Sequence, residues 1–438
     1  MKLTTENKIL FSRILTRSGD QAWDFAVPLV LLMIFPDQLK IAALYYFLVK
    51  LVTVMSLPKL TSFIDRLNRL KTARLGIALQ LVGVIVGTAA IFQLSTFSSE
   101  VFNWDNFNAS SGFVFLVLGG ILSSLGSGFM DIAIANDLVP STINEKDLSK
   151  FNSRLRQVDL LTEVTSPVIA GLILMLDQPL LLGFFIVAIW NVISFFPELA
   201  LLQSIFRDRP DLMEKKIQIH EFSKRTIFEK LTLGWRAFFK EPVALVALAY
   251  SFLWLSVLSP HGVLLAAYLK DGWQLPEWGI GTFRGMGAIF GLLATFLYPI
   301  AEKKWGLLKG TRNFIVYQTA ALIIALVCFF QAGIFGQVGF LVFILLSRIG
   351  LYGFSLGEMQ IRQIGINANV RGEVNGFATA LTGIATLALY GAGALLPTTE
   401  DFKILVVGSV VFVGMGCWVY LFWLRTTQFK PKSIELEP

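Results

Sequence analysis

The sequence predicts an all-α membrane protein with twelve transmembrane helices, arranged as two six-helix halves. The first observation is composition: hydrophobic residues make up 55% of the chain and charged residues 15%, whereas soluble domains are about a quarter charged. The second is that the apolar residues fall into twelve runs of roughly 20, the length of a membrane-spanning helix. The third is a single long polar stretch that divides these runs six and six.

Each run is long and apolar enough to cross a bilayer as a helix. The runs before the polar stretch lie at residues 16–35, 40–62, 74–96, 112–138, 152–176 and 180–205. The runs after it lie at residues 242–269, 279–300, 313–334, 337–363, 372–397 and 403–425. We therefore expect an N-half at 1–206, a linker at 207–241 and a C-half at 242–438.

Loop charges predict the orientation in the membrane. Lysine and arginine gather between spans two and three, between spans eight and nine, and in the linker, which holds nine of them. The alternate loop at 97–112 carries only Glu100 and Asp105. The positive-inside rule then places the linker and both termini in the cytoplasm of a multi-pass cell (inner) membrane protein. Six plus six spans around such a linker is the layout of major facilitator transporters.

Several function classes are disfavoured by the sequence. The net charge of +7 follows from basic cytoplasmic loops, so we expect no nucleic-acid partner. The two cysteines, Cys328 and Cys417, lie inside apolar segments and predict no disulfide framework. No nucleotide-binding glycine loop, zinc motif or nucleophile elbow occurs, so we expect neither an enzyme nor a cofactor.

Acidic residues inside the first span indicate a cation path. Asp20 and Asp24 stand four residues apart, and residues at that spacing share one face of a helix. Carboxylates in a membrane-spanning helix are costly, so they usually face a cavity or an ion rather than lipid. The pair therefore predicts that the chain moves a cation.

A second polar face lies in the sixth span. Asn191, Ser194 and Glu198 follow the spacing i, i+3 and i+7, and Gln80 lies in the third span. Oxygen ligands of this kind suit hard or borderline divalent cations. The alternative is that the amides and the hydroxyl only hydrogen-bond across helices, which is common in bundles.

In the C-half the strongest metal-ligand candidate is His261. It follows Pro260 and precedes Gly262, and proline breaks or kinks a helix. Transporters place ion sites at such broken spans because the released carbonyls can coordinate. The alternative is that His261 is a core residue whose hydrogen bonds are satisfied within the protein. Cys417 in the last span could supply sulfur, or could be a small packing residue.

Charged and polar residues at the cytoplasmic ends of the spans are candidates for an inner gate. They are Asp65, Arg69, Asp137, Asn152 and Arg156 in the first half, and Arg348 and Arg371 in the second. Opposite charges that meet between the halves could close the path, while ordinary positive-inside decoration is the alternative. Asp159 and Glu163 lie near Arg154 and Arg156, where an ion pair is as plausible as a ligand role.

Motifs spread over most of the chain resemble the ferroportin family of iron exporters, with particular similarity to its bacterial members. The matching pieces are Gly19-Asp20-x-x-Trp23-x-Phe25-Ala26-Val27, Arg69-Leu70-Lys71, Gln80, Asn152 with Arg156 and Asp159, Trp190-Asn191-x-x-Ser194 with Glu198, Arg348-Ile349-Gly350-Leu351, and Arg371-Gly372-x-x-Asn375-Gly376. Their order and spacing make the match fairly specific.

The resemblance implies one metal site in each half and metal/proton antiport. The N-half site would involve Asp20, Asp24, Asn191 and Ser194, although animal members have a histidine where this chain has Asp24. Animal members also pair a cysteine in the seventh span with a late histidine. At those two positions this chain has His261 and Cys417. Gln80, Asn191 and Glu198, with Asp20, match the oxygen ligands of a family calcium site.

The residues predict an exporter of divalent metal by alternating access, and the resemblance implies that the metal is ferrous iron, with Co²⁺, Mn²⁺, Ni²⁺ or Zn²⁺ as related cargo. Its partners would be the metal, protons and the lipid bilayer, with Ca²⁺ or K⁺ as a regulator, and we expect a monomer. One alternative is a major facilitator exporter of drugs or amphiphilic cations, which would be indifferent to metals. A membrane receptor or scaffold is another, and would leave the intramembrane acids without a purpose.

Overall fold

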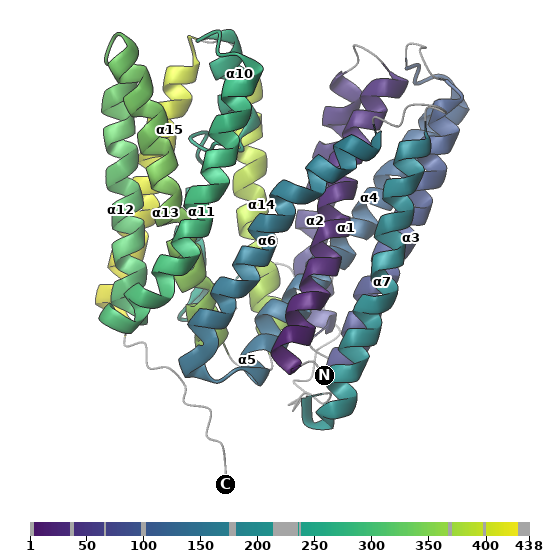
Figure 1. The fold of residues 1–438 in the computed structure, drawn as a ribbon, viewed down its shortest axis with the longest axis horizontal. Helices are drawn as coiled ribbons and strands as arrows, with labels where there is room; N and C mark the ends of the chain where they lie inside the picture. The colour runs from purple at the N-terminus through teal and green to yellow at the C-terminus, as the bar shows by residue number, and fades with distance from the viewer. Residues whose placement is uncertain are drawn as a thin grey trace. The chain divides into compact units, whose positions relative to one another are not determined.

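The structure is a computed structural model that describes residues 4–35, 39–64, 67–97, 102–174, 181–212, 235, 238–366, 370–396 and 400–427. Within these ranges the chain forms helices and no strand, so the all-α prediction is confirmed (Figure 1). The elements are α1 (Thr5–Ile34), α2 (Leu39–Ile64), α3 (Arg69–Ser95), α4 (Phe107–Asp131), the π-helix η1 (Ile132–Leu138), α5 (Val139–Thr142), α6 (Glu145–Leu174), α7 (Leu182–Asp208), the short 3₁₀ helix η2 (Pro210–Leu212), α9 (Ala244–Leu253), α10 (Val263–Asp271), α11 (Glu277–Trp305), α12 (Leu307–Phe329), α13 (Ile334–Gly365), α14 (Arg371–Leu395) and α15 (Phe402–Thr426).

The predicted spans fall on these helices with two departures. The fourth span runs from α4 through the π-helix into α5, and the seventh is divided between α9 and α10. The first helix also begins at Thr5, well before the predicted residue 16. Its start is capped by Thr4, whose hydroxyl accepts from the backbone N–H of Asn7 at 3.3 Å. Most of the predicted linker lies outside the described residues.

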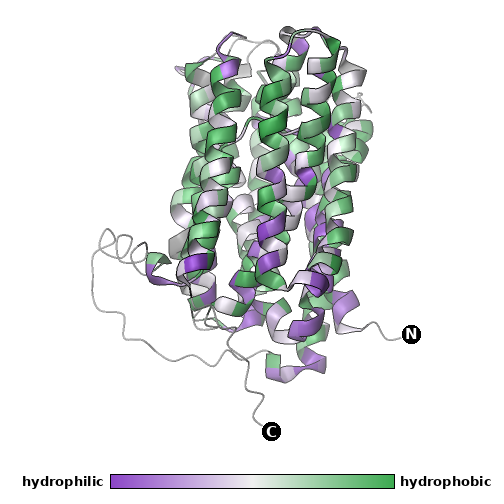
Figure 2. Ribbon diagram, turned by 90° about the vertical axis from the view of Figure 1, so that its left-hand side faces the viewer, coloured by the Kyte–Doolittle hydropathy of each residue, from purple (hydrophilic) through white to green (hydrophobic). Residues whose placement is uncertain are grey.

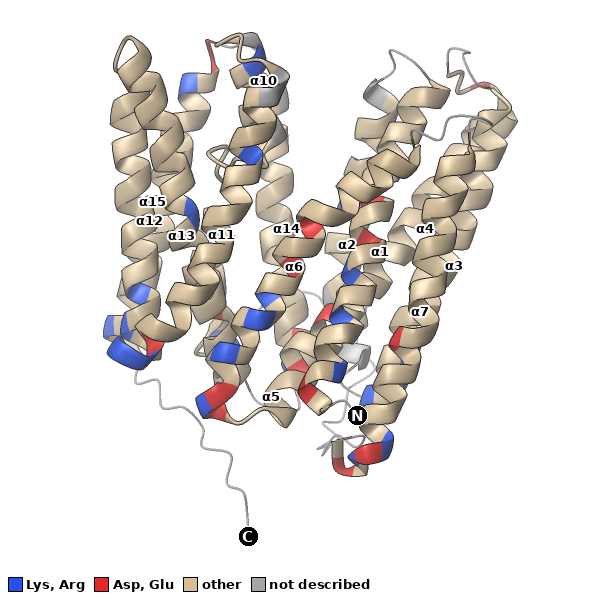
Figure 3. Ribbon diagram, viewed as in Figure 1, with Lys and Arg blue, Asp and Glu red and all other residues tan. Residues whose placement is uncertain are grey.

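Length and hydropathy identify the membrane-spanning helices. Nine of the described helices are long and apolar enough to cross a bilayer. The helices α1 and α2 and the two pieces of the seventh span fall outside this set, and in α2 only the shorter stretch Ile41–Leu57 counts as apolar. In α1, charged side chains interrupt the apolar run, and α9 and α10 are short because the chain breaks between them. Figure 2 shows apolar residues over the upper and middle parts of the helices, and Figure 3 shows most charged residues at their lower ends.

Contacts divide the chain into two compact units. One unit comprises Met1–Thr142, Val158–His220 and Ala368–Gly376, and the other comprises Ile143–Gln157, Glu221–Asn367 and Phe377–Pro438. The first unit thus contains α1 to α5, most of α6, α7 and the first turns of α14. The second contains the start of α6, the helices from α9 to α13, the rest of α14, and α15.

Close helix packing in the first unit depends on small residues. A methyl group added at Gly83 of α3 would lie 2.5 Å from the backbone nitrogen of Ser123 in α4, and one at Gly126 would lie 2.5 Å from the carbonyl of Gly76. Transmembrane helices gain packing energy when such residues let their backbones approach. The apolar core of this unit surrounds Trp23, which packs on Phe184 of α7 with ring centroids 5.3 Å apart.

The second unit is built in the same way around α13. A methyl group at Gly350 would lie 2.7 Å from the backbone of Phe314 and Gln318 in α12. At the other side of the core, α15 packs on α9, because Gly416 lies against the carbonyl of Ala249. These contacts hold α13 and α15 beside the interrupted seventh span, where the C-half candidate site lies.

Candidate functional site

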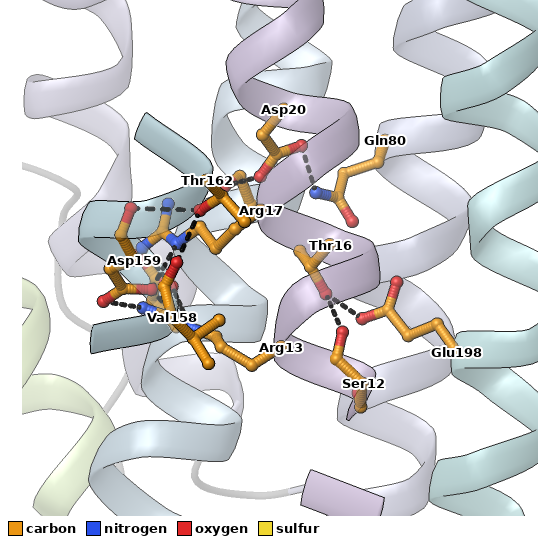
Figure 4. Close-up of polar contacts among 12 residues, drawn as sticks. Ser12, Arg13, Thr16, Arg17, Asp20, Gln80, Val158, Asp159, Thr162 and Glu198 are labelled. Atoms are coloured by element: carbon orange, nitrogen blue, oxygen red, sulfur yellow. Dashed lines mark hydrogen bonds and ion pairs between the residues drawn. The ribbon is translucent and has the colours of Figure 1, made fainter. Parts of the chain in front are cut away.

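Asp20 is a buried carboxylate that links α1 to two other helices. It is 8% exposed. Its Oδ1 accepts a hydrogen bond from Gln80 Nε2 of α3 at 3.1 Å, and its Oδ2 accepts from Ser127 Oγ of α4 at 2.5 Å (Figure 4). Two of the predicted site residues, Asp20 and Gln80, are therefore in direct contact. Ser127 was not predicted, because a single serine in an apolar span carries little signal.

Asn191 and Ser194 of α7 lie against the backbone of α1 at Gly19. The side-chain N–H of Asn191 donates to the Gly19 carbonyl at 3.2 Å. A methyl group at Gly19 would lie 2.6 Å from Asn191 Oδ1 and 3.2 Å from Ser194 Oγ, so only glycine permits this approach. The backbone of α1 thus brings Asp20 and the polar face of α7 together.

Glu198 lies farther along the same face of α7, and the hydroxyl of Thr16 donates to its Oε1 (Figure 4). Glu198 is fully buried. Thr16 and Asp20 are four residues apart and therefore share one face of α1. Glu198 contacts this face one turn before Asp20. The structure thus gathers these side chains around α1: Gln80 and Ser127 contact Asp20 from α3 and α4, and Asn191, Ser194 and Glu198 line the seam between α1 and α7.

Three buried oxygens on this seam accept no hydrogen bond within the described part of the chain. They are Gln80 Oε1, Asn191 Oδ1 and Glu198 Oε2. All three residues are 0% exposed. A buried polar atom without a partner costs free energy, and native proteins rarely tolerate one. Gln80 contacts Asp20, Asn191 contacts the neighbouring Gly19, and Glu198 contacts Thr16 one turn away. Their amide and carboxylate oxygens are ligands of the kind that suits a hard or borderline cation.

The structure places Asp24 differently from Asp20. Asp24 lies one turn farther along α1 with an exposed side chain, and its carbonyl accepts a hydrogen bond from the hydroxyl of Tyr46 in α2. The inward position beside it is taken by Trp23. Within the described residues no three His, Cys, Asp or Glu side chains form a metal-binding group. The N-half donor set therefore depends on amide and hydroxyl oxygens as much as on acids.

A charged cluster adjoins Asp20 on the same helix. Arg13 donates to Asp159 Oδ1 of α6 at 2.7 Å and to Oδ2 at 3.0 Å, and it also contacts Asp131 of α4. Arg17 donates to the two oxygens of Asp131 at 2.7 and 2.6 Å. Sequence reasoning placed Asp159 beside Arg154 and Arg156, and the structure pairs it with Arg13 and Arg17 of α1. The spacing of Arg13 and Arg17, one turn apart, was the available signal.

In the C-half, the chain between Leu253 and Val263 forms turns in place of helix. Arg348 of α13 is buried there and donates to the carbonyl of Leu258 at 2.8 Å. Ser409 Oγ of α15 accepts from the Val257 N–H at 2.9 Å. Side chains from two neighbouring helices therefore satisfy backbone groups that the interrupted helix leaves open. Arg348 was predicted as a gate residue, but its contacts are with this broken span.

His261 lies at the α11 side of the broken span. A methyl group added at Gly287 would lie 2.7 Å from Pro260 and 3.5 Å from His261 Nε2, so this glycine makes room for both. Arg284 donates to the His261 carbonyl at 3.4 Å. Cys417 is buried on α15, beside Gly416, which faces α9. The contacts given for His261 are with α11, whereas the Cys417 thiol hydrogen-bonds with Thr319 of α12.

The remaining gate candidates fall into two groups within the units. Arg69 forms a bidentate pair with Asp137 at 3.1 Å for both bonds, and Arg371 lies 3.8 Å from the same carboxylate. Asn152 and Gln363 exchange hydrogen bonds at 2.6 and 3.3 Å, and the Arg156 guanidinium lies 4.8 Å from the Tyr352 ring centre. Asp65 lies outside the described residues.

Comparison with known proteins gives a consistent result over the whole chain. The family described as Ferroportin1 (FPN1) matches residues 4–413. The chain is 42% identical over 423 residues to "Ferreportin" of Bdellovibrio bacteriovorus, which covers 96% of this chain and 95% of that protein.

Two solved structures extend the similarity. One is a bacterial homologue of the iron transporter ferroportin, in an outward-facing state with soaked iron. It aligns with a TM-score of 0.86 and 41% identity, over 96% of this chain and 100% of that one. The other is a proton:xylose symporter of the major facilitator superfamily, with a TM-score of 0.68 over 96% of this chain and 95% of that one. At 13% identity the symporter shows the fold alone, and it confirms the predicted major facilitator architecture.

Proposed function

The chain belongs to the ferroportin family of membrane transporters, and on that premise we propose that it exports ferrous iron and related divalent transition metals by alternating access. It is a transporter and not an enzyme. A homologue of the iron transporter ferroportin has been solved with soaked iron, which supports iron as the cargo. Because the cargo binds and leaves, its ligands are those of a substrate site rather than of a resident cofactor.

The observation that carries this proposal is a set of unpaired oxygens on side chains of α3 and α7 that contact α1. Gln80 Oε1, Asn191 Oδ1 and Glu198 Oε2 are buried and accept no hydrogen bond within the described residues. A cation that takes these oxygens as ligands removes the cost of burying them unpaired. Asp20 adds a full negative charge, and a charged ligand strengthens cation binding.

We assign the N-half donors to Ca²⁺ or K⁺ as well as to the transported metal. Asp20, Gln80, Asn191 and Glu198 offer only oxygen, the ligand that Ca²⁺ prefers, and Ser194 and Asp24 would complete a path along α1. His261 offers nitrogen at the broken seventh span, and imidazole suits Fe²⁺, Co²⁺ and Ni²⁺. The C-half would then select the transition metal, with Cys417 as a second donor.

Proton antiport follows from the chemistry of these ligands. A histidine or carboxylate must lose its proton before it can bind a metal, so metal binding releases protons. Metal loading from the cytoplasm would therefore discharge protons there, and release outside would allow the same groups to be protonated again. In this proposal the chain comprises an N-half (1–206), a linker (207–241) and a C-half (242–438), and both termini are cytoplasmic.

Closure of the inner side is assigned to the pairs at the helix ends. Arg69 and Arg371 share Asp137, and a buried carboxylate with two basic partners is costly to separate. Asn152 and Arg156 contribute through Gln363 and Tyr352. Each of these contacts would have to break for a cytoplasmic metal to enter.

Calorimetric titration of the purified chain with Co²⁺, Ca²⁺ and a lipophilic cation tests the proposal. We expect heat from Co²⁺ and Ca²⁺ and none from the lipophilic cation. Asp20→Asn and Glu198→Gln should weaken Ca²⁺ binding by at least about tenfold, since even loss of a partner to a metal ligand costs 10- to 100-fold. His261→Ala should remove the Co²⁺ signal selectively.

The matched control is Asp105→Asn, which removes a carboxylate from an exposed loop between spans. It should leave all titrations unchanged. Heat from the lipophilic cation alone would refute the metal proposal and favour an amphiphile exporter. Parent-like Co²⁺ binding in His261→Ala would refute the C-half assignment.

A further inference from the structure

The Arg13–Arg17–Asp131–Asp159 cluster lies next to the proposed cation seam but takes no part in it. Two arginines come from α1, one aspartate from α4 and one from α6, so the cluster is neutral in sum. Figure 4 shows Arg13, Arg17 and Asp159 of this cluster. Arg13 spans both carboxylates, Arg17 takes both oxygens of Asp131, and Arg17 Nε lies 3.4 Å from Asp159 Oδ1. Each positive charge therefore has a carboxylate in contact.

Arg17 and Asp20 occupy neighbouring positions on the same interface. Arg17 precedes Asp20 by three residues, so the two side chains leave α1 on adjoining faces. Both meet α4: Arg17 binds Asp131, and Asp20 accepts from Ser127, four residues before Asp131. The carboxylates of Asp20 and Asp131 are therefore alternative partners that one flexible guanidinium can reach.

The choice of partner decides whether Asp20 can bind a cation. A guanidinium on Asp20 would occupy its oxygens and place a positive charge at the cation position. In a buried seam such a charge repels a divalent cation strongly, because the effective dielectric constant is low. Asp131 prevents this by giving Arg17 two oxygens at 2.7 and 2.6 Å. Asp159 supports it by holding Arg13, which otherwise competes for Asp131.

We propose that Asp131, supported by Asp159, is a positioning residue that holds Arg17 off Asp20 and so keeps that carboxylate available to a cation. This inference rests on the proposed cation site at Asp20. It assigns a function to a cluster that otherwise looks like a structural clamp between α1, α4 and α6. The two roles make opposite predictions when Arg17 is removed.

The experiment is a double-mutant cycle on the full chain, read by Ca²⁺ calorimetry at fixed pH and two salt concentrations. Asp131→Asn should weaken Ca²⁺ binding by about tenfold or more, because Arg17 then turns to Asp20. Arg17→Gln should bind Ca²⁺ as tightly as the parent or more tightly, since it leaves an additional negative charge one turn away. The double variant Arg17→Gln with Asp131→Asn should return to within about threefold of the parent.

A structural clamp gives a different pattern. Arg17→Gln alone would then weaken Ca²⁺ binding, and the double variant would be no better than Asp131→Asn; either result overturns the inference. If Asp131→Asn cannot be purified, Arg17→Gln alone decides, because the two roles predict opposite signs. A parent chain that binds neither Ca²⁺ nor Co²⁺ overturns the proposed function and this inference with it, whereas a binding parent without rescue overturns only the inference.

Discussion

Gly19 sets how closely α1 approaches the polar face of α7. It lies between Arg17 and Asp20, and its carbonyl accepts from Asn191 at 3.2 Å. Any side chain here would collide with Asn191 Oδ1, one of the three unpaired oxygens. Gly19, which has no side chain, therefore sets the distance between α1 and the polar side chains of α7.

Gly19→Ala should lower the free energy of unfolding by about 1–3 kcal/mol, as overpacking of a tight interface usually does. It should also weaken Ca²⁺ binding, because the new methyl group would lie 2.6 Å from Asn191 Oδ1 and must displace it. Thermal unfolding and calorimetry measure the two effects.

The matched control for this change is Gly281→Ala on α11, where an added methyl group meets nothing within 4 Å. It should leave both stability and Ca²⁺ binding near the parent values. Parent-like behaviour of Gly19→Ala would show that the α1–α7 spacing does not set the site.

At the scale of elements, the interrupted seventh span is held open by its neighbours. Arg348 and Ser409 satisfy backbone groups at Leu258 and Val257. Arg348 is buried, and within the described residues its guanidinium donates to the Leu258 carbonyl and to the hydroxyls of Ser259 and Ser347. The bonds to Leu258 and Ser259 tie the loop between α9 and α10 to α13, and this loop carries His261.

Arg348→Met should therefore loosen the segment 254–262 without unfolding the unit. We expect faster amide hydrogen exchange in this segment, with α12 retaining parent rates, because the Leu258 carbonyl loses its donor. The loss of stability should be about 1–3 kcal/mol, the cost of leaving a buried acceptor unpaired.

Arg312→Met on the exposed side of α12 is the control, since this arginine donates to its neighbour Asn313 and not to the broken span. It should leave exchange in residues 254–262 unchanged. Equal exchange in Arg348→Met and the parent would show that the loop keeps its shape without the guanidinium.

Sequence patterns predicted the elements better than their ends. Apolar runs located the spans, because bilayer thickness fixes the length of a helix. They could not locate the π-helix at Ile132–Leu138, because the apolar pattern does not distinguish a π-helical turn from an α-helical one. They also missed the start of α1 at Thr5, since residues 5–15 mix polar and apolar side chains that only tertiary packing makes helical.

At the scale of the whole molecule, the sequence did not predict which helices that are distant in the chain contact one another. The i, i+3, i+7 face of α7 correctly grouped Asn191 and Ser194, and their meeting with α1 at Gly19 came from the fold. Asp20 and Asp24 looked equivalent because they share a helical face. Trp23 fills the core beside them, and Asp24 is left exposed.

The central claim is that a divalent metal and protons move in opposite directions through this chain. The direct measurement uses proteoliposomes that contain a pH-sensitive dye and are exposed to a Co²⁺ gradient. The account predicts that protons leave the vesicles as Co²⁺ enters, so the internal pH rises. It also predicts that this rise is lost in His261→Ala. Vesicles that transport a lipophilic cation but show no Co²⁺-dependent change of internal pH would contradict the account. A His261→Ala chain that exchanges Co²⁺ for protons at the parent rate would contradict it as well.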